Sequence, residues 1–242
     1  RDSSTSRGLG DVYKRQVHWC RKKKIPFISW TDGTLNSEKN IGKVQRLSRS
    51  YIIKRAAAFI ASSTASREAQ IAYGADEKKC FISYLTVDIQ KYLYEKPQKT
   101  TQNEGLQLLY VGSLIQRKGL DLLLPALAKT PQNIRLWIVG EGQEKDLLQK
   151  QCTELKISDR VEFLGYQEGE PLQKLYRTAD AFVLPTREDC FGLVLLEAMC
   201  ASLPIISSKY ADGARDLVSD GENGYIIAVS YTHLTLPTNR EV

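Results

Sequence analysis

Short apolar segments alternate with amphipathic segments along the second half of the chain. The apolar segments have the length and composition of buried strands, and the segments between them have the spacing of helices. We predict strands at residues 106–112, 134–140, 160–165, 181–186, 203–208 and 224–228. We predict helices at residues 119–130, 144–156, 171–179, 191–201 and 213–220. This order is typical of a parallel, doubly wound α/β sheet that helices cover on both faces.

Residues 17–94 show the same alternation in a shorter form. The expected elements are strands at 25–30 and 56–63, helices at 41–55 and 64–73, and a strand with a loop over 78–88. Residues 95–105 are polar, contain Pro, Gly and Thr, and have no periodic pattern, which is typical of a linker. The sequence therefore predicts two α/β domains, residues 17–94 and residues 106–228.

The two ends of the chain do not continue this pattern. Residues 1–16 are polar without periodicity, and residues 229–242 interrupt the last expected strand. We expect both segments to be non-native sequence, and the alternative is a natural flexible tail. On this interpretation the first domain lacks its first part, and the second lacks a C-terminal tail.

The helix expected at residues 191–201 is apolar on every face except at Glu197. Such a helix is expected in the interior or under a second domain. A carboxylate there is costly, by several kcal/mol in order of magnitude, unless it has a partner. Two kinds of partner remain open: an Arg, Lys or backbone group of the protein, or the hydroxyl groups of a ligand.

Further polar groups gather at the start of this helix. Asp189 comes just before it, and Phe191, Gly192 and Leu193 are expected to present free backbone N–H groups to an anion. Together with Glu197, these groups favour a ligand that carries both phosphate and hydroxyls.

A second loop leaves the strand at Gly112 and enters a helix near Gly119. Arg117 and Lys118 lie in this loop and are suited to a diphosphate, the Arg as a fork and the Lys as a point charge. The alternative is that both are solvated cations before a helix. Ligands of doubly wound sheets bind at the carboxyl ends of the strands, where both loops are expected.

One stretch, residues 185–204, reads PTREDCFGLVLLEAMCASLP. It resembles the signature of the family 4 retaining glycosyltransferases, which have the GT-B fold of two Rossmann-like domains. That signature has an acid, seven residues that include Phe-Gly, then Glu-Ala, a small-residue turn and a proline. Asp189 stands where the family usually has Glu, and Ser202 where it usually has Gly. Lys118-Gly119 also matches the family pattern, whereas Ser113 replaces an Arg.

The resemblance implies transfer of a sugar from a nucleotide diphosphate sugar to an acceptor hydroxyl, with retention of configuration. It implies that Lys118, supported by Arg117, binds the donor diphosphate and that Glu197 binds the nucleotide ribose. Asp189 and residues 191–193 are then expected to bind the donor sugar. The acceptor is expected to be a glycan or a lipid-linked group. The catalytic residue is expected in the absent first part, so that this chain binds donor without turnover.

Composition narrows the function classes further. The chain has 242 residues, 42% of them hydrophobic, and a net charge of +6. Without aromatic interleaving of its basic residues, nucleic-acid binding is not expected. The five cysteines lack metal-ligand spacing, which is typical of reduced thiols in a cytoplasmic protein. No Asp-x-Asp motif, zinc constellation or phosphate-binding loop ending in Gly-Lys-Ser/Thr is present, so we expect neither a metal nor a cofactor.

Several alternatives stay open at this level. Residues 21–24 (Arg-Lys-Lys-Lys) are either a solvated helix end or a contact with the inner face of the membrane. Trp30, Asp32 and Gly33 either border an acceptor cleft or form a plain turn after a strand. A non-catalytic nucleotide-sugar-binding module and a GT-B-type nucleotide-sugar epimerase are the main alternative functions. A dehydrogenase is poorly supported, because the Gly140–Gly142 segment lacks the third glycine of a dinucleotide fingerprint.

Overall fold

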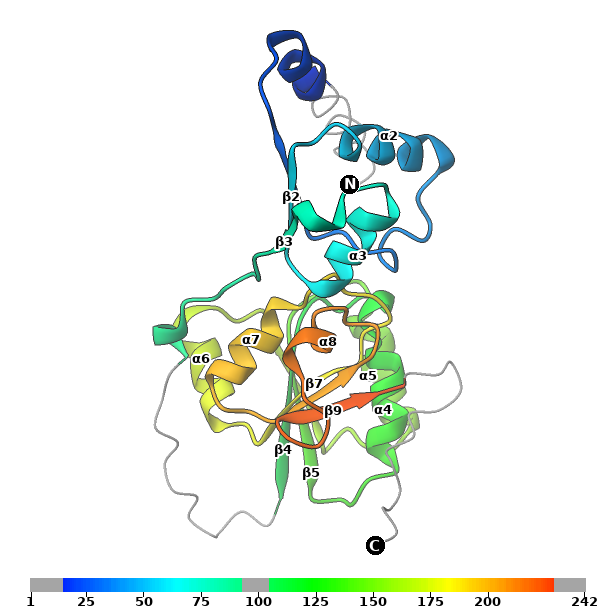
Figure 1. Ribbon diagram of the computed structural model, residues 1–242. Helices are drawn as coiled ribbons and strands as arrows, with labels where there is room; N and C mark the ends of the chain where they lie inside the picture. Colours follow the sequence, from blue (N-terminus) through cyan, green and yellow to red (C-terminus); the bar gives the residue numbers. More distant parts are fainter. Residues whose placement is uncertain (1–14, 93–104, 229–242) are drawn as a thin grey trace, which may run out of the picture. The chain divides into compact units, whose positions relative to one another are not determined.

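The computed structural model describes residues 15–92 and 105–228. The chain divides between Leu85 and Thr86 into two compact units, called unit 1 and unit 2 below (Figure 1). The predicted linker and the two predicted terminal segments lie outside the described residues, except for Arg15, Gln16 and Gly105. Arg15 and Gln16 belong to a helix over residues 15–23, which the sequence pattern did not predict.

Unit 1 is an α/β unit with a three-stranded parallel sheet in the order β1-β2-β3. Its elements are β1 (Ile28–Thr31), α2 (Lys43–Ile53), β2 (Ala58–Ala61), α3 (Thr64–Ala72), a 3₁₀ turn η1 (Glu77–Lys79) and β3 (Cys80–Ile82). Helix α3 begins where predicted, because the Ser63 side chain accepts a hydrogen bond from the Ser66 amide and caps the helix. The buried core is small, consisting of Ile53, Phe59, Ala75 and Cys80.

Unit 2 contains a six-stranded parallel sheet in the order β6-β5-β4-β7-β8-β9. The strands are β4 (Leu106–Val111), β5 (Ile134–Val139), β6 (Val161–Gly165), β7 (Ala181–Leu184), β8 (Ile205–Ser208) and β9 (Gly224–Ile227). The helices are α4 (Leu120–Ala128), α5 (Lys145–Glu154), α6 (Gly169–Thr178), α7 (Leu193–Cys200) and α8 (Ala214–Leu217), with 3₁₀ turns η2 (Ile89–Lys91) and η3 (Gln116–Lys118). The predicted doubly wound parallel sheet is confirmed.

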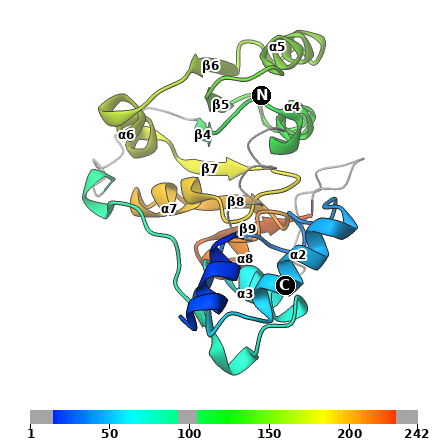
Figure 2. The ribbon, with the colours of Figure 1, turned by 90° about the horizontal axis from the view of Figure 1, so that it is seen from above.

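The helices of unit 2 cover both faces of this sheet. Figure 2 shows α4 and α5 on one face and α6 and α7 on the other. The inner strands carry the centre of the core, where Leu109, Leu136 and Phe182 have no exposed surface. Because the strands β4, β7 and β8 are parallel neighbours, the loops that follow them lie at one edge of the sheet.

Helix α7 is less buried than its apolar sequence predicted. Leu195 and Ala198 are its fully buried residues, whereas 43% of Leu193 is exposed. Of the two expected locations, the interior does not hold for the whole helix, and a position under a second domain stays a prediction. One face of α7 packs on the sheet, and the other carries Leu193 at the helix start.

The basic segment at residues 21–24 is exposed at the end of the helix over residues 15–23. Within the described parts of the chain, no helix has both the length and the apolar character needed to cross a membrane. Contact of the basic segment with a membrane stays a prediction.

Candidate functional site

The loops after β4 and β7 lie directly against each other. The Thr186 hydroxyl donates a 3.0 Å hydrogen bond to the carbonyl oxygen of Arg117, and the Arg187 amide donates a 2.8 Å bond to the same oxygen. Gly119 makes this approach sterically allowed: a Cβ atom there would lie 2.1 Å from the Pro185 carbonyl oxygen. Gly119 also has a φ of +75°, which favours glycine. The glycine of the Lys-Gly pair is thus required by the contact between the two loops.

Lys118 and Asp189 form a direct ion pair across these loops. Each side chain is only 15% exposed, so water screens the pair weakly. The Lys was expected at the diphosphate and the Asp at the sugar, and their contact with each other was not predicted. An ammonium group has three N–H donors, so Lys118 keeps donors for a ligand while it is paired.

Arg117 lies beside this pair but is exposed. Its Nη1 atom donates a 2.9 Å hydrogen bond to the carbonyl oxygen of Glu188. The side chain therefore also holds the loop after β4 to the loop after β7. Its predicted role as a second cation for the diphosphate stays a prediction.

Two groups that support these loops were missed in the sequence. Arg187 makes a bidentate ion pair with Asp121 in the first turn of α4, with both N–O distances at 2.7 Å. Buried Tyr110 at the end of β4 donates a 3.0 Å bond to the Ser113 carbonyl oxygen. Burial and, next, the negative charge of Asp189 raise the pKa of Tyr110, so its hydroxyl stays protonated. No periodic pattern marks Arg187, and Tyr110 reads as an ordinary core residue.

The start of α7 has the features expected of an anion site. Gly192 occupies the N-cap position with a φ of +78°, and Phe191 is buried. Within the described residues, the amides of Phe191, Gly192 and Leu193 donate to no protein oxygen. The first amides of a helix lack intrahelical partners and carry partial positive charge. This end of α7 therefore suits a phosphate or a polar sugar group.

Asp189 is fixed in front of this helix by backbone pairing. Its amide donates a 3.0 Å bond to the Tyr210 carbonyl oxygen, and its own carbonyl oxygen accepts a 2.9 Å bond from the Asp212 amide. The loop after β8 therefore sets the position of the acid. The sequence pattern did not reveal this support.

Glu197, farther along α7, has tyrosine partners. The Tyr176 hydroxyl donates a 2.7 Å hydrogen bond to Oε2 of Glu197. Burial and, next, the negative charge of Glu197 raise the pKa of Tyr92 to about 12, so Tyr92 lies near this carboxylate. Within the described residues Glu197 has no Lys or Arg partner, and a tyrosine hydroxyl was not among the partners that the sequence left open. Its predicted contact with ligand hydroxyls stays a prediction.

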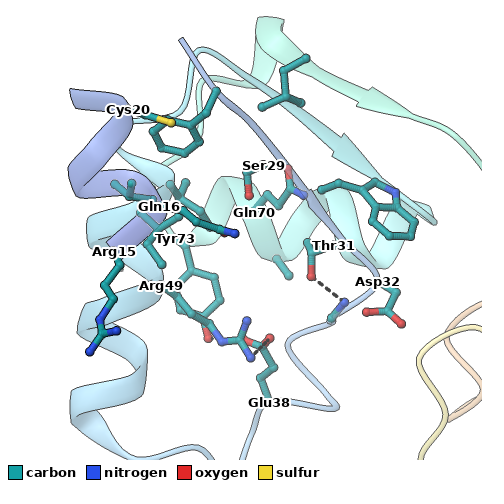
Figure 3. A pocket seen from close by; sticks show the side chains of 18 of the residues that line it. Arg15, Gln16, Cys20, Ser29, Thr31, Asp32, Glu38, Arg49, Gln70 and Tyr73 are labelled. Carbon is teal, nitrogen blue, oxygen red and sulfur yellow. Dashed lines mark hydrogen bonds and ion pairs between the residues drawn. The ribbon is translucent and has the colours of Figure 1, made fainter. Parts of the chain in front are cut away.

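A separate cavity of about 980 Å³ lies within unit 1 (Figure 3). None of the predicted site residues lines it, although Trp30, Asp32 and Gly33 do. The Gly33 amide donates a 3.0 Å bond to the Thr31 hydroxyl, as expected of a turn after a strand. In the cavity wall, buried Glu38 accepts bonds from Arg49 at 2.9 Å and from Tyr73 at 2.7 Å.

The described residues contain no cluster of three or more His, Cys, Asp or Glu side chains that could hold a metal ion. The groups that the structure brings together at the edge of the unit 2 sheet are instead a cation, an acid and free amides. The expectation of a site without metal or cofactor stays a prediction.

Residues 94–234 match the family Glycosyl transferases group 1. The lipopolysaccharide core biosynthesis glycosyltransferase LpsE of Rhizobium meliloti is 32% identical over 135 residues, which are 56% of this chain and 38% of that protein. The lipopolysaccharide 1,6-galactosyltransferase of Salmonella typhimurium is 28% identical over 217 residues, which are 88% of this chain and 57% of that protein.

The fold is similar to that of Anabaena HepE in complex with UDP. The TM-score is 0.79 at 24% identity, and the likeness covers 90% of this chain and 63% of that chain. The architecture is thus that of GT-B glycosyltransferases, as the sequence predicted. The chain spans less than two thirds of the length of each of these relatives.

Proposed function

Because the chain belongs to the Glycosyl transferases group 1 family, we propose that it acts in transferring a sugar from a nucleoside diphosphate sugar to an acceptor hydroxyl. The proposal includes retention of the anomeric configuration, as in the family 4 enzymes. This chain covers 38% and 57% of the two lipopolysaccharide enzymes above. The activity and the partners of a whole protein are therefore also part of the proposal.

One observation carries the proposal: Lys118 is paired with Asp189 immediately before the free amides at the start of α7. A cation and a helix N-terminus together form a site for a diphosphate. The acid beside them supplies an acceptor for sugar hydroxyls. A ligand that contacts the cation, the helix N-terminus and the acid must carry both a diphosphate and a sugar.

These groups also suit the chemistry of transfer. Negative charge builds on the diphosphate as its bond to the sugar breaks. Lys118, with Arg117, and the amides of residues 191–193 are positioned to stabilise that charge, which is how a site lowers a barrier electrostatically. No metal is needed in this arrangement. Glu197 is assigned to the ribose hydroxyls, because a carboxylate accepts hydrogen bonds from two neighbouring hydroxyls.

The acceptor is proposed to be a glycan or a lipid-linked group, by analogy with the lipopolysaccharide enzymes above. Because the Anabaena protein was solved in complex with UDP, we propose a nucleoside diphosphate as the leaving group of the donor. We do not assign the base of this nucleoside. We assign no catalytic residue to this chain. Proton NMR of a transfer product would test retention through the anomeric configuration.

The direct test is calorimetric titration of UDP, ADP and GDP into the full chain and a Lys118→Met variant. We expect at least one nucleotide to bind, and Lys118→Met to weaken that binding about tenfold or more, since a charge-assisted hydrogen bond contributes about 1.5–3 kcal/mol. Asp189→Asn removes the ion pair but keeps the positive charge of Lys118. This variant should therefore retain its affinity for the diphosphate.

Lys150→Met is the matched control. Lys150 is 75% exposed and pairs with Glu154 at 3.9 Å on the surface, so its loss should leave nucleotide affinity unchanged. Circular dichroism checks that each variant is folded. Equal affinity of folded Lys118→Met and wild type would contradict the proposed diphosphate site.

A further inference from the structure

In the described part of the chain, the Glu197 carboxylate has tyrosine neighbours, and no Lys or Arg forms an ion pair with it. Tyr176 reaches its Oε2 atom at 2.7 Å, and Tyr92 lies at the same carboxylate. These two tyrosines come from different segments, Tyr176 from α6 and Tyr92 from the residue that follows η2. Neither was singled out by the sequence pattern.

The Tyr176 ring is held rigidly in place. It stacks on Phe182 of β7, with ring centroids 5.9 Å apart, and no part of the residue is exposed. The Tyr92 ring meets it edge-on, with centroids 5.6 Å apart and an interplanar angle of 88°. Both are favourable aromatic geometries. The direction in which Tyr176 points its hydroxyl is therefore fixed by the core.

A tyrosine constrains a carboxylate differently from an arginine. An Arg fork usually occupies both carboxylate oxygens, whereas a phenol donates a single hydrogen. Bonded to Tyr176 through Oε2, Glu197 keeps acceptor positions on Oε1. The Tyr176 hydroxyl keeps its proton at neutral pH, because burial and then the charge of Glu197 raise its pKa strongly. The same two causes raise the pKa of Tyr92 to about 12.

We infer that Tyr176, braced by Tyr92, is a positioning residue that holds one oxygen of Glu197 so that the other faces the ribose diol of the nucleotide. This inference rests on the proposed function, in which Glu197 binds the ribose. It extends the site to two side chains that do not touch the ligand. The simpler alternative is that Glu197 only satisfies a buried tyrosine hydroxyl, which needs an acceptor.

The positioning role and the merely structural role of Tyr176 can be separated by comparing the affinities of ligands with and without the ribose hydroxyls. The probes are the tightest-binding nucleotide among UDP, ADP and GDP, and its 2′,3′-dideoxy counterpart, titrated into the full chain. In the wild type we expect the ribonucleotide to bind at least tenfold more tightly. Tyr176→Phe should weaken the ribonucleotide about fivefold to tenfold and leave the dideoxynucleotide nearly unchanged. Tyr92→Phe should act in the same direction but less.

Tyr73→Phe is the matched control, since the Tyr73 hydroxyl donates a bond of the same 2.7 Å length to Glu38 in unit 1. It should change neither affinity. A merely structural role for Tyr176 would weaken both ligands equally, and an unchanged ratio of the two affinities overturns the inference. If the wild type does not prefer the ribonucleotide, the ribose role of Glu197 fails as well. If no nucleotide binds, the proposed function fails with it.

Discussion

Lys118 and Asp189 are 71 residues apart in the sequence and form a direct ion pair between the loops after β4 and β7. The pair places a cation and an acid in front of the free amides of α7. It also makes the two side chains depend on each other, because each is largely removed from water. Their contributions to folding and to binding are therefore coupled.

We expect this coupling to appear in a double-mutant cycle. Lys118→Met and Asp189→Asn should each lower the free energy of unfolding of unit 2 by about 1–3 kcal/mol, because each leaves a partly buried partner unpaired. The double variant should cost less than the sum of the two. Urea unfolding followed by Trp137 fluorescence, with Trp19 and Trp30 replaced by Phe, measures this. Strict additivity would show that the pair is energetically irrelevant.

Gly119→Ala should disrupt the contact between the two loops. The new Cβ would meet the Pro185 carbonyl oxygen at 2.1 Å, and the φ of +75° adds backbone strain of about 1–2 kcal/mol. Gly169→Ala isolates the strain, since Gly169 has a φ of +59° and open space around its Cβ position. We expect Gly119→Ala to lower the melting temperature more than Gly169→Ala and to abolish nucleotide binding. Comparable melting temperatures and intact binding in both variants would contradict this account of the loop contact.

Arg187→Lys should weaken the loop after β7 although the charge is kept. A lysine cannot make the bidentate contact with Asp121, whose two N–O distances are 2.7 Å. Because Asp121 is 36% exposed, we expect a loss of only about 0.5–1.5 kcal/mol in stability. Arg67→Lys, at the more exposed pair with Glu77, is the control and should cost less. A smaller loss at Arg187 than at Arg67 would argue against a supporting role.

Because the pKa of Tyr92 is raised in the folded chain, we expect the protein to lose stability at high pH. Tyr92 has a pKa near 10 when unfolded and about 12 when folded, through burial and then the charge of Glu197. Above pH 10 the unfolded chain releases a proton that the folded chain retains, so stability should fall between pH 10 and about pH 12. Thermal melting across this window should show a shallower decline for Tyr92→Phe. Identical pH profiles would mean that the folded chain does not raise the pKa of Tyr92 through burial and Glu197.

Much of the fold followed from local pattern. Runs such as those at β4 and β5 are apolar over the length of a buried strand, and this property does not depend on distant residues. The helix over residues 15–23 was missed because its first residues are polar. The exposure of Leu193 was also missed, since an apolar residue at a helix start need not be buried.

The site was predictable only where a short motif carries it. Asp189, Gly192 and Glu197 lie within one stretch, and Lys118-Gly119 within another. Other contacts depend on strand order and helix packing: the Lys118–Asp189 pair, the Arg187–Asp121 pair and the two tyrosines at Glu197. Those contacts join segments far apart in the sequence, and no spacing rule within one segment encodes them.

The most direct test of the donor site is amide chemical-shift mapping on the ¹⁵N-labelled full chain during titration with its tightest nucleoside diphosphate. We expect the largest shifts at the amides of Phe191, Gly192 and Leu193 and at Lys118, because the diphosphate should bind there. Shifts confined to the unit 1 cavity around Trp30 and Asp32, or no shifts at saturating nucleotide, would contradict a donor site in unit 2.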